Sequence, residues 1–171
     1  MGAGQRGRVV ESSVTVRTMG VDDLDEVMEI DRLTPLVPHW GRAAYEKYAV
    51  ASRNGIFHRC ALVAVGDDAV AGFVAGSFLE GDAAAVLENL AVKATEQRKG
   101  AAMALCAAFS KWAREQGAEG VELEVRVGNV AARGLYARLG FIEQGRRAKY
   151  YRDPEEDAML MRVELEPVAA G

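Results

Sequence analysis

Alternating apolar and polar residues run through most of the chain and predict a β-sheet. Between Val121 and Val127 every second residue is apolar, and the residues between them are charged. A period of two is typical of a strand with one buried face. Similar alternation, or short apolar runs bounded by turn residues, predicts the other strands. The predicted strands are Ser13–Met19, His58–Val65, Ala69–Phe78, Ala84–Val92, Val121–Val127, Phe141–Tyr151 and Met159–Leu165.

A longer period, of three to four residues, predicts the helices. Leu105, Phe109 and Trp112 share one helix face, and the following Gly117 is a natural residue for the helix end. Pro35 interrupts the chain between two earlier helices. The predicted helices run from a cap at Asp22 or Asp23 to Leu33, from Gly41 to Arg53, from Lys99 to Gln116 and from Val130 to Leu139.

The order of these elements predicts a mixed α/β fold. One strand and two helices come first, followed by three strands, a helix, a strand, a helix and two strands. We therefore expect a mixed sheet of about seven strands flanked by about four helices. A chain of 171 residues fits one domain. The expected parts are a flexible N-terminal tail at 1–11, the domain at 12–166 and a C-terminal tail at 167–171.

Composition and charge exclude several classes of protein. Hydrophobic residues make up 50% of the chain and charged residues 27%, which is typical of globular proteins rather than disordered ones. The net charge of -4 argues against a nucleic-acid partner held by a basic face. No apolar run approaches the roughly 20 residues of a membrane-spanning helix, and we expect a cytoplasmic protein with no membrane partner. With 2 Cys and 2 His, we expect no metal site and no disulfide framework.

One segment has the features of an anion-binding site. The predicted strand ending at Val92 is followed by a short connection, and Arg98 and Lys99 then precede the small residues Gly100 and Ala101 at a helix start. A helix start carries unpaired N–H groups and partial positive charge, so pyrophosphate is a natural occupant. An alanine-rich helix with solvated basic residues explains the same pattern equally well.

A second segment could carry chemistry, although each of its residues has an ordinary explanation. Glu124 suits a solvated strand face, Asn129 suits a helix cap, and Tyr136 suits packing against the sheet. Their combination is more informative: Leu-Glu-Val-Arg at 123–126, Asn129, Leu-Tyr at 135–136 and Leu-Gly-Phe at 139–141. With Asn-Leu-Ala-Val at 89–92 and Gln-Arg-Lys-Gly-Ala-Ala at 97–102, this stretch resembles the acetyl-CoA-binding core of the GNAT N-acetyltransferases. Within this family, the sequences of these motifs are most similar to those of the bacterial ribosomal-protein-alanine N-acetyltransferase branch.

The resemblance implies a fold, an acyl donor and site residues. It implies a mostly antiparallel GNAT-like sheet and acetyl-CoA as the cofactor. Glu124 matches the general base of the family and Tyr136 its general acid, while Asn129 matches an amide that contacts the cofactor. Backbone groups of Leu90, Ala91 and Val92 would bind the pantetheine arm. The pyrophosphate would be held by the turn formed by Arg98, Lys99, Gly100, Ala101, Ala102 and Met103.

The acceptor is framed by two further segments. Trp40, Tyr150 and Tyr151 lie in regions that flank the peptide groove of the resembled branch, and their rings could pack along an extended peptide. The main hypothesis is therefore acetyl transfer to a protein N-terminal α-amine, with a ribosomal protein as a candidate acceptor, by a monomer or homodimer. The alternatives are a small amine, amino acid or polyamine as acceptor, or an acyl-CoA-binding sensor without turnover.

Overall fold

The computed structural model describes residues 14–50 and 55–167. The predicted N-terminal tail at 1–11 lies outside the described residues, as does the C-terminal tail beyond residue 167. The strands are β1 (Thr15–Thr18), β2 (Phe57–Gly66), β3 (Ala69–Leu79), β4 (Ala84–Val92), β5 (Gly120–Arg126), β6 (Ile142–Tyr151) and β7 (Glu156–Glu164). The helices are α1 (Leu24–Leu33), α2 (Arg42–Ala49), α3 (Ala101–Gln116) and α4 (Val130–Arg138), with short 3-10 turns η1 (Val21–Asp23) and η2 (Ala94–Glu96).

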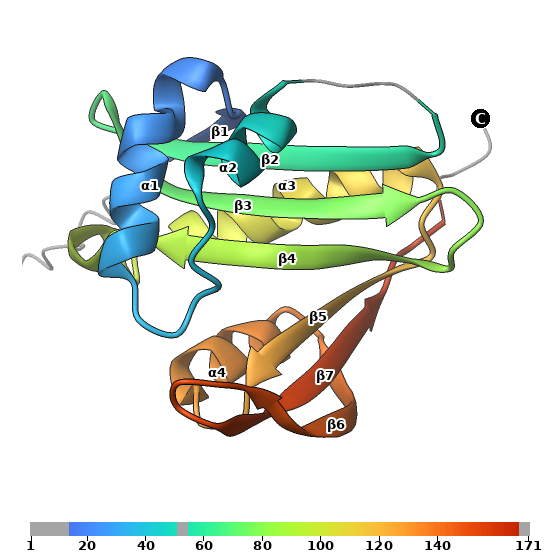
Figure 1. Cartoon of the computed structure of the whole chain (residues 1–171). Helices are drawn as coiled ribbons and strands as arrows, with labels where there is room; N and C mark the ends of the chain where they lie inside the picture. Colours follow the sequence, from blue (N-terminus) through green and yellow to red (C-terminus); the bar gives the residue numbers. More distant parts are fainter. Residues whose placement is uncertain (1–13, 51–54, 168–171) are drawn as a thin grey trace, which may run out of the picture.

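All of these strands form a single sheet, in the order β1-β2-β3-β4-β5-β7-β6 (Figure 1). β4 and β5 pair in parallel, and the other neighbouring strands pair antiparallel. The parallel pairing follows from chain order, because α3 lies between β4 and β5 and returns the chain to the same end of the sheet. The predicted mixed, mostly antiparallel sheet with four flanking helices is confirmed.

Helices cover both faces of the sheet and divide the core into two apolar clusters. On one face α3 and α4 pack against the sheet, with Leu105, Phe109 and Tyr136 among the buried side chains. On the other face α1 and α2 pack around Tyr45 and Phe73. Glycine at position 76 allows the close approach on the α3 side, because a Cβ there would lie 2.4 Å from the Phe109 ring. None of the helices within the described residues is long and apolar enough to cross a membrane.

The parallel pairing of β4 with β5 is short, and the sheet opens beyond it. Only Ala84–Val86 of β4 pair with β5, at residues 120–122. From Leu87 onwards the two strands diverge, and Figure 1 shows β5 turning away from β4. Along this stretch the backbone edges that face each other have no strand partner among the described residues. Such edges offer free N–H and C=O groups to a ligand.

Three predicted details of the helices were wrong. α3 begins at Ala101 rather than Lys99, because Arg98 and Gly100 have φ values of +63° and +88°, outside the helical region. α2 ends at Ala49 and Val50 is extended, whereas the prediction continued to Arg53. Asp23 does not cap α1 through its side chain. Its carboxylate instead accepts hydrogen bonds of 2.7 and 2.8 Å from Arg17.

Candidate active site

A bulge in β4 places two polar side chains on one face of the sheet. The β3–β4 register shifts by one residue at Glu88. An extra residue breaks the usual alternation of side chains between the two faces. As a result both Glu88 and Asn89 point towards α2, where Glu88 accepts a hydrogen bond from Tyr48 and Asn89 donates one to Tyr45.

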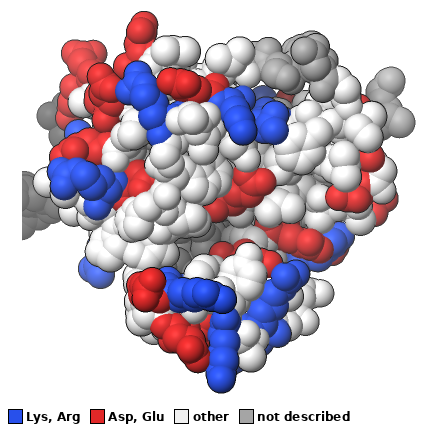
Figure 2. Space-filling view, viewed as in Figure 1, with Lys and Arg blue, Asp and Glu red and all other residues white. Residues whose placement is uncertain are grey.

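The larger cavity of the site, of about 680 Å³, lies where β4 and β5 diverge. This volume is within the range of small-molecule pockets. Figure 2 shows the hollow between the part of the molecule with α1 and α2 and the part with β6, with acidic side chains around it. Its lining includes Trp40, Glu88, Glu122, Glu124, Tyr150 and Tyr151. The structure therefore brings the three predicted acceptor residues together with the predicted base.

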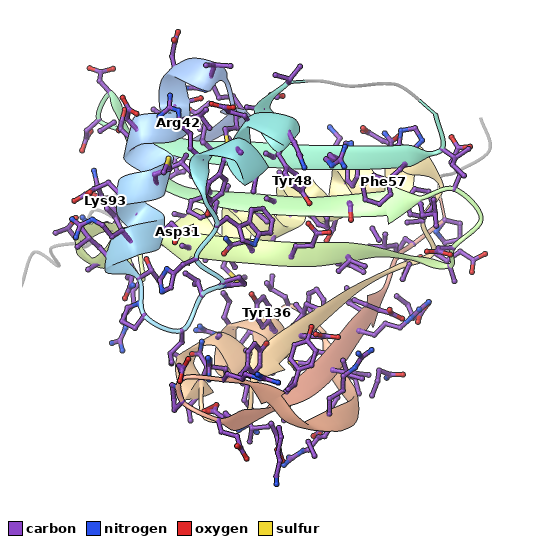
Figure 3. All side chains as sticks on the ribbon, in the orientation of Figure 1. Asp31, Arg42, Tyr48, Phe57, Lys93 and Tyr136 are labelled. Atoms are coloured by element: carbon purple, nitrogen blue, oxygen red, sulfur yellow. The ribbon has the colours of Figure 1, made fainter. Side chains whose placement is uncertain are left out.

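A smaller cavity of about 70 Å³ adjoins the larger one on the side of α4. Leu90, Asn129 and Tyr136 line it, and in Figure 3 Tyr136 lies where β4 and β5 diverge. Residues that line both cavities mark the junction between them. They are Pro38, Leu87, Glu88, Leu123, Glu124 and Tyr151.

Glu124 of β5 is held by partners on β6. Its Oε1 lies 3.5 Å from Arg147 Nε, and its side chain is 28% exposed. A hydrogen bond to Glu124 is the main cause that raises the pKa of Tyr150. Because the carboxylate remains partly open to the cavity, it is accessible to a ligand there.

Tyr136 of α4 is buried, and its ring contacts Phe141 edge-on with centroids 5.5 Å apart. Burial raises the pKa of the Tyr136 phenol above its ordinary value. The phenol therefore keeps its proton at neutral pH, as a proton donor must. Asn129 caps α4 by accepting a hydrogen bond of 3.2 Å from Ala132 N–H, so the capping interpretation of this residue is confirmed.

The start of α3, predicted as a possible anion site, lies apart from the two cavities. The first N–H groups of α3, at Ala101, Ala102 and Met103, have no acceptor within the helix. A Cβ at Gly100 would meet nothing within 4 Å, so the space in front of this turn is open. Lys99 lies 3.7 Å from Glu96 across the same turn.

The β4 residues predicted to bind the cofactor do not share one face. Leu90 and Val92 pack on the α3 side, whereas the Ala91 side chain is buried in the α1–α2 cluster. Ala91 could therefore contact a ligand only through its backbone. The unpaired β4 edge provides such backbone groups, and it leads from the junction of the cavities towards the start of α3.

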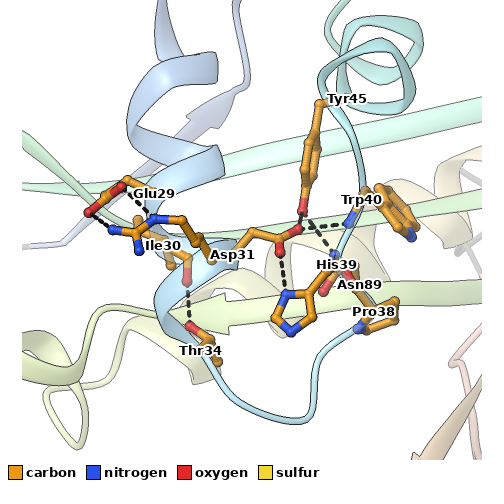
Figure 4. A network of polar contacts seen from close by, with 10 residues as sticks. Glu29, Ile30, Asp31, Thr34, Pro38, His39, Trp40, Tyr45 and Asn89 are labelled. Carbon is orange, nitrogen blue, oxygen red and sulfur yellow. Dashed lines mark hydrogen bonds and ion pairs between the residues drawn. The ribbon is translucent and has the colours of Figure 1, made fainter. Parts of the chain in front are cut away.

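A buried polar network fixes the connection between α1 and α2, which forms one wall of the site (Figure 4). Asp31 accepts hydrogen bonds from His39 Nδ1 at 2.7 Å, from Trp40 N–H at 3.1 Å and from the Tyr45 hydroxyl. Asn89 Nδ2 donates to the Tyr45 hydroxyl and to the Pro38 carbonyl. This network ties Trp40 to both α1 and β4.

Sequence reasoning missed Glu88, although it noted the segment that contains it. Glu88 Oε1 accepts a hydrogen bond of 2.6 Å from Ser77 Oγ, and its Oε2 accepts one from Tyr48. Tyr48 stacks on Trp40 with ring centroids 5.1 Å apart. The carboxylate next to a run of apolar strand residues was the one available signal. Glu88 shares the cavity side with Val86, and the bulge adds Asn89 to the same face of the sheet.

Known proteins of similar sequence identify the family of this chain. The model of the acetyltransferase (GNAT) family matches residues 24–141, more than half of the chain. A Bacillus subtilis protein provisionally named a ribosomal protein bS18-alanine N-acetyltransferase is 31% identical over 156 residues, which cover 91% of this chain and 99% of that protein. An N-alpha-acetyltransferase of Saccharolobus solfataricus is 30% identical over 158 residues, or 86% of this chain and 90% of that protein.

A solved structure shows the same fold. The crystal structure of the ribosomal-protein-S18-alanine N-acetyltransferase from Escherichia coli matches with a TM-score of 0.75 and 25% identity, covering 92% of this chain and 97% of that chain. The likeness therefore extends over nearly the whole length of both proteins. The chain belongs to the acetyltransferase (GNAT) family, and it is an N-acetyltransferase with acetyl-CoA as its acyl donor.

Proposed function

We propose that this enzyme acetylates the α-amine at the N-terminus of a protein, with Glu124 as general base and Tyr136 as general acid. The observation that carries the proposal is the meeting of these two side chains at the small cavity where β4 and β5 diverge. The names of the bacterial relatives support a ribosomal protein that begins with alanine as the acceptor.

Acetyl-CoA supplies the acetyl group as a thioester. For its binding we propose the unpaired β4 edge at Leu90, Ala91 and Val92 as the partner of the pantetheine arm. The first N–H groups of α3, together with Arg98 and Lys99, would hold the pyrophosphate. Asn129 lines the small cavity, and its Oδ1 caps α4. It would therefore contact the arm through its Nδ2 group.

The acceptor side supplies the base. An α-amine has a pKa of about 8, so a large fraction carries a proton at pH 7 and cannot attack. Glu124 accepts this proton, directly or through a water molecule. Arg147 and Tyr150 keep the carboxylate oriented towards the larger cavity. Tyr136 gives its own proton to the sulfur that leaves from the opposite side.

The aromatic wall of the larger cavity suits an extended peptide. Trp40, Tyr150 and Tyr151 lie around the entrance to the junction, and the Tyr150 and Tyr151 rings meet edge-on with centroids 5.0 Å apart. Aromatic side chains bury much surface at low entropic cost, so they favour the chain of a peptide over a single small amine.

Acetyl transfer followed by mass spectrometry tests the proposal. The protein and acetyl-CoA are mixed with peptides that begin with Ala or another residue, each with its lysines blocked. The same peptides with a blocked α-amine and a free lysine form the matched control, and a panel of small amines and polyamines forms the third set. We expect product on the free α-amine, with preference for a small first residue.

Two other outcomes would contradict the proposal. Product on small amines alone would move the function to small-molecule acetylation. No product in any set, with acetyl-CoA still bound in a calorimetric titration, would favour the sensor. Turnover of the α-amine peptides is therefore the result on which the proposal depends.

A further inference from the structure

We propose that Glu88 is a second acceptor-binding carboxylate, which receives the ammonium form of the incoming amine before Glu124 takes its proton. This inference rests on the proposed function and assigns a substrate contact to a residue that neither the motifs nor the comparisons single out. It starts from the position of Glu88, which lines both cavities and so stands at the same junction as Glu124.

Local structure holds the Glu88 side chain in one place. Its side chain points towards α2 beside the β4 bulge, and its two oxygens each accept a hydrogen bond from a neutral hydroxyl, one of Tyr48 and one of Ser77. Ser77 is 5% exposed, so the hydrogen bond between Ser77 and Glu88 is shielded from solvent on the Ser77 side. Two hydroxyl donors orient a carboxylate without neutralising it, because neither carries a positive charge.

The other carboxylates of the cavity have arginine partners. Glu124 lies 3.5 Å from Arg147, and Glu122 lies 2.8 Å from Arg162. Arg59 of β2 lies opposite Ser77 in the β2–β3 register, with its guanidinium carbon 5.8 Å from the Tyr48 ring centroid, but within the described residues it forms no ion pair with Glu88. Among Glu88, Glu122 and Glu124, Glu88 is therefore the one whose carboxylate is held by uncharged hydrogen-bond partners.

The groups around Glu88 come from several elements. Tyr48 of α2 and Ser77 of β3 contact it directly. Facing it across the cavity are the titratable or charged groups Glu122 and Glu124 of β5 and Arg147, Tyr150 and Tyr151 of β6, while Arg59 of β2 lies over the Tyr48 ring and opposite Ser77. The Trp40 ring, stacked on Tyr48, adds an aromatic face beside the carboxylate. An anion beside aromatic rings is a typical environment for an ammonium group.

Glu88 and Glu124 lie at the same junction and can act on the acceptor in successive steps. The acceptor arrives mostly as an ammonium ion at pH 7, and Glu88 attracts and holds this form. Glu124 then removes the proton, and the neutral amine no longer needs the charge of Glu88. Glu88 therefore affects binding of the acceptor more than the chemical step.

The test compares Glu88→Gln with the wild-type enzyme on a free α-amine peptide at pH 7 and pH 9. Glutamine keeps the shape but lacks the charge. Its amide oxygen can accept a hydrogen bond from one of the two hydroxyls, and its NH2 group can donate one to the other. We expect KM for the peptide to rise roughly ten- to hundredfold at pH 7, with kcat changed by less than about threefold. At pH 9 only about a tenth of the peptide is an ammonium ion, so the charge of Glu88 matters less. The ratio of KM between Glu88→Gln and the wild type should therefore be smaller at pH 9 than at pH 7.

Two further variants make the result specific. Glu119→Gln removes the same charge from an exposed position before β5 and should leave KM unchanged at both pH values. Glu88→Asp keeps the charge, and its KM should lie between those of the wild type and Glu88→Gln at pH 7. A fall in stability alone would raise KM equally at both pH values.

The inference is overturned if Glu88→Gln has wild-type KM at pH 7, or if its KM penalty is the same at pH 9. A wild-type enzyme that acetylates no α-amine peptide would instead overturn the proposed function, and the two failures are thus distinguishable. Acetyl-CoA affinity, measured separately by calorimetry, should be equal in all of these variants.

Discussion

At the scale of single residues, the junction of the two cavities contains two partly buried carboxylates with different surroundings. Glu124 is balanced by Arg147 and hydrogen-bonded to Tyr150, whereas Glu88 is held by two neutral hydroxyls. The same side-chain type can therefore serve proton transfer in one place and recognition of a cation in the other. The difference lies in the partners and not in the residue type.

Glu124→Gln removes the proposed base and keeps the size of the side chain. We expect kcat to fall by about 10²-fold or more, because an amide cannot accept the amine proton. The dissociation constant of acetyl-CoA should stay within about twofold, since Glu124 lies on the acceptor side. Steady-state kinetics and calorimetry check both parts, and a kcat near that of the wild type would remove Glu124 from the mechanism.

Tyr136→Phe tests the proposed acid. Only the hydroxyl is lost, and the ring contact with Phe141 remains, so the melting temperature should change little. Because burial raises the pKa of this phenol, its proton is present throughout the neutral range, and the variant should be slower by about 10- to 100-fold at every pH from 6 to 9. An unchanged rate at each pH would show that water can protonate the leaving sulfur.

At the scale of elements, the divergence of β4 and β5 creates the site. Short parallel pairing leaves the rest of both inner edges open, and the bulge at Glu88 turns polar side chains towards the acceptor cavity. α3 then begins near the far end of the open β4 edge. One strand and one helix start together can therefore contact both the reactive end and the charged end of a long cofactor.

The turn before α3 requires glycine at position 100, and a matched pair of variants tests its role. Gly100 has a φ of +88°, whereas Gly134 lies inside α4, and a Cβ at either residue would meet nothing within 4 Å. Gly100→Ala should lower the free energy of unfolding by about 1–2 kcal/mol, because alanine is strained at positive φ. Gly134→Ala should raise it by about 0.5–1 kcal/mol, because alanine favours a helix.

The same pair tests the proposed pyrophosphate site. A shift of the turn should weaken acetyl-CoA binding several-fold in Gly100→Ala, since the first N–H groups of α3 would lose their alignment. Urea unfolding and calorimetry measure the two effects separately. If Gly100→Ala bound acetyl-CoA as tightly as the wild type, the pyrophosphate would have to lie elsewhere.

At the scale of the whole molecule, the sheet could be predicted from the sequence, and the family motifs named residues that the structure brings close together. Periods of two and of 3.6 residues report which face of each element is buried, so the order of elements and the fold could be predicted. Glu124, Asn129 and Tyr136 are close together in the chain, and local motifs identify them. The structure places all three at the same small cavity.

Features that depend on contacts between distant segments could not be predicted. The bulge at Glu88 is set by the register of β4 against β3, and simple alternation would send Glu88 and Asn89 to opposite faces. The network around Asp31 joins α1, the α1–α2 connection and β4. No period within a single element contains that information.

The Asp31 network connects the wall of the acceptor cavity to the core of the fold, so its loss should lower the free energy of unfolding of the whole molecule. Asp31 is 3% exposed and accepts hydrogen bonds from Trp40 N–H and the Tyr45 hydroxyl, so Asp31→Ala would leave buried donors without an acceptor. We expect a loss of about 2–4 kcal/mol, equivalent to a fall of roughly 5–15 °C in Tm.

Asp25→Ala removes a carboxylate from the same helix, but that side chain is 89% exposed and pairs with Arg42 at the surface. It should therefore cost less than about 1 kcal/mol. Thermal unfolding of the two variants measures the difference, and equal losses would show that the buried network contributes no more than a surface ion pair.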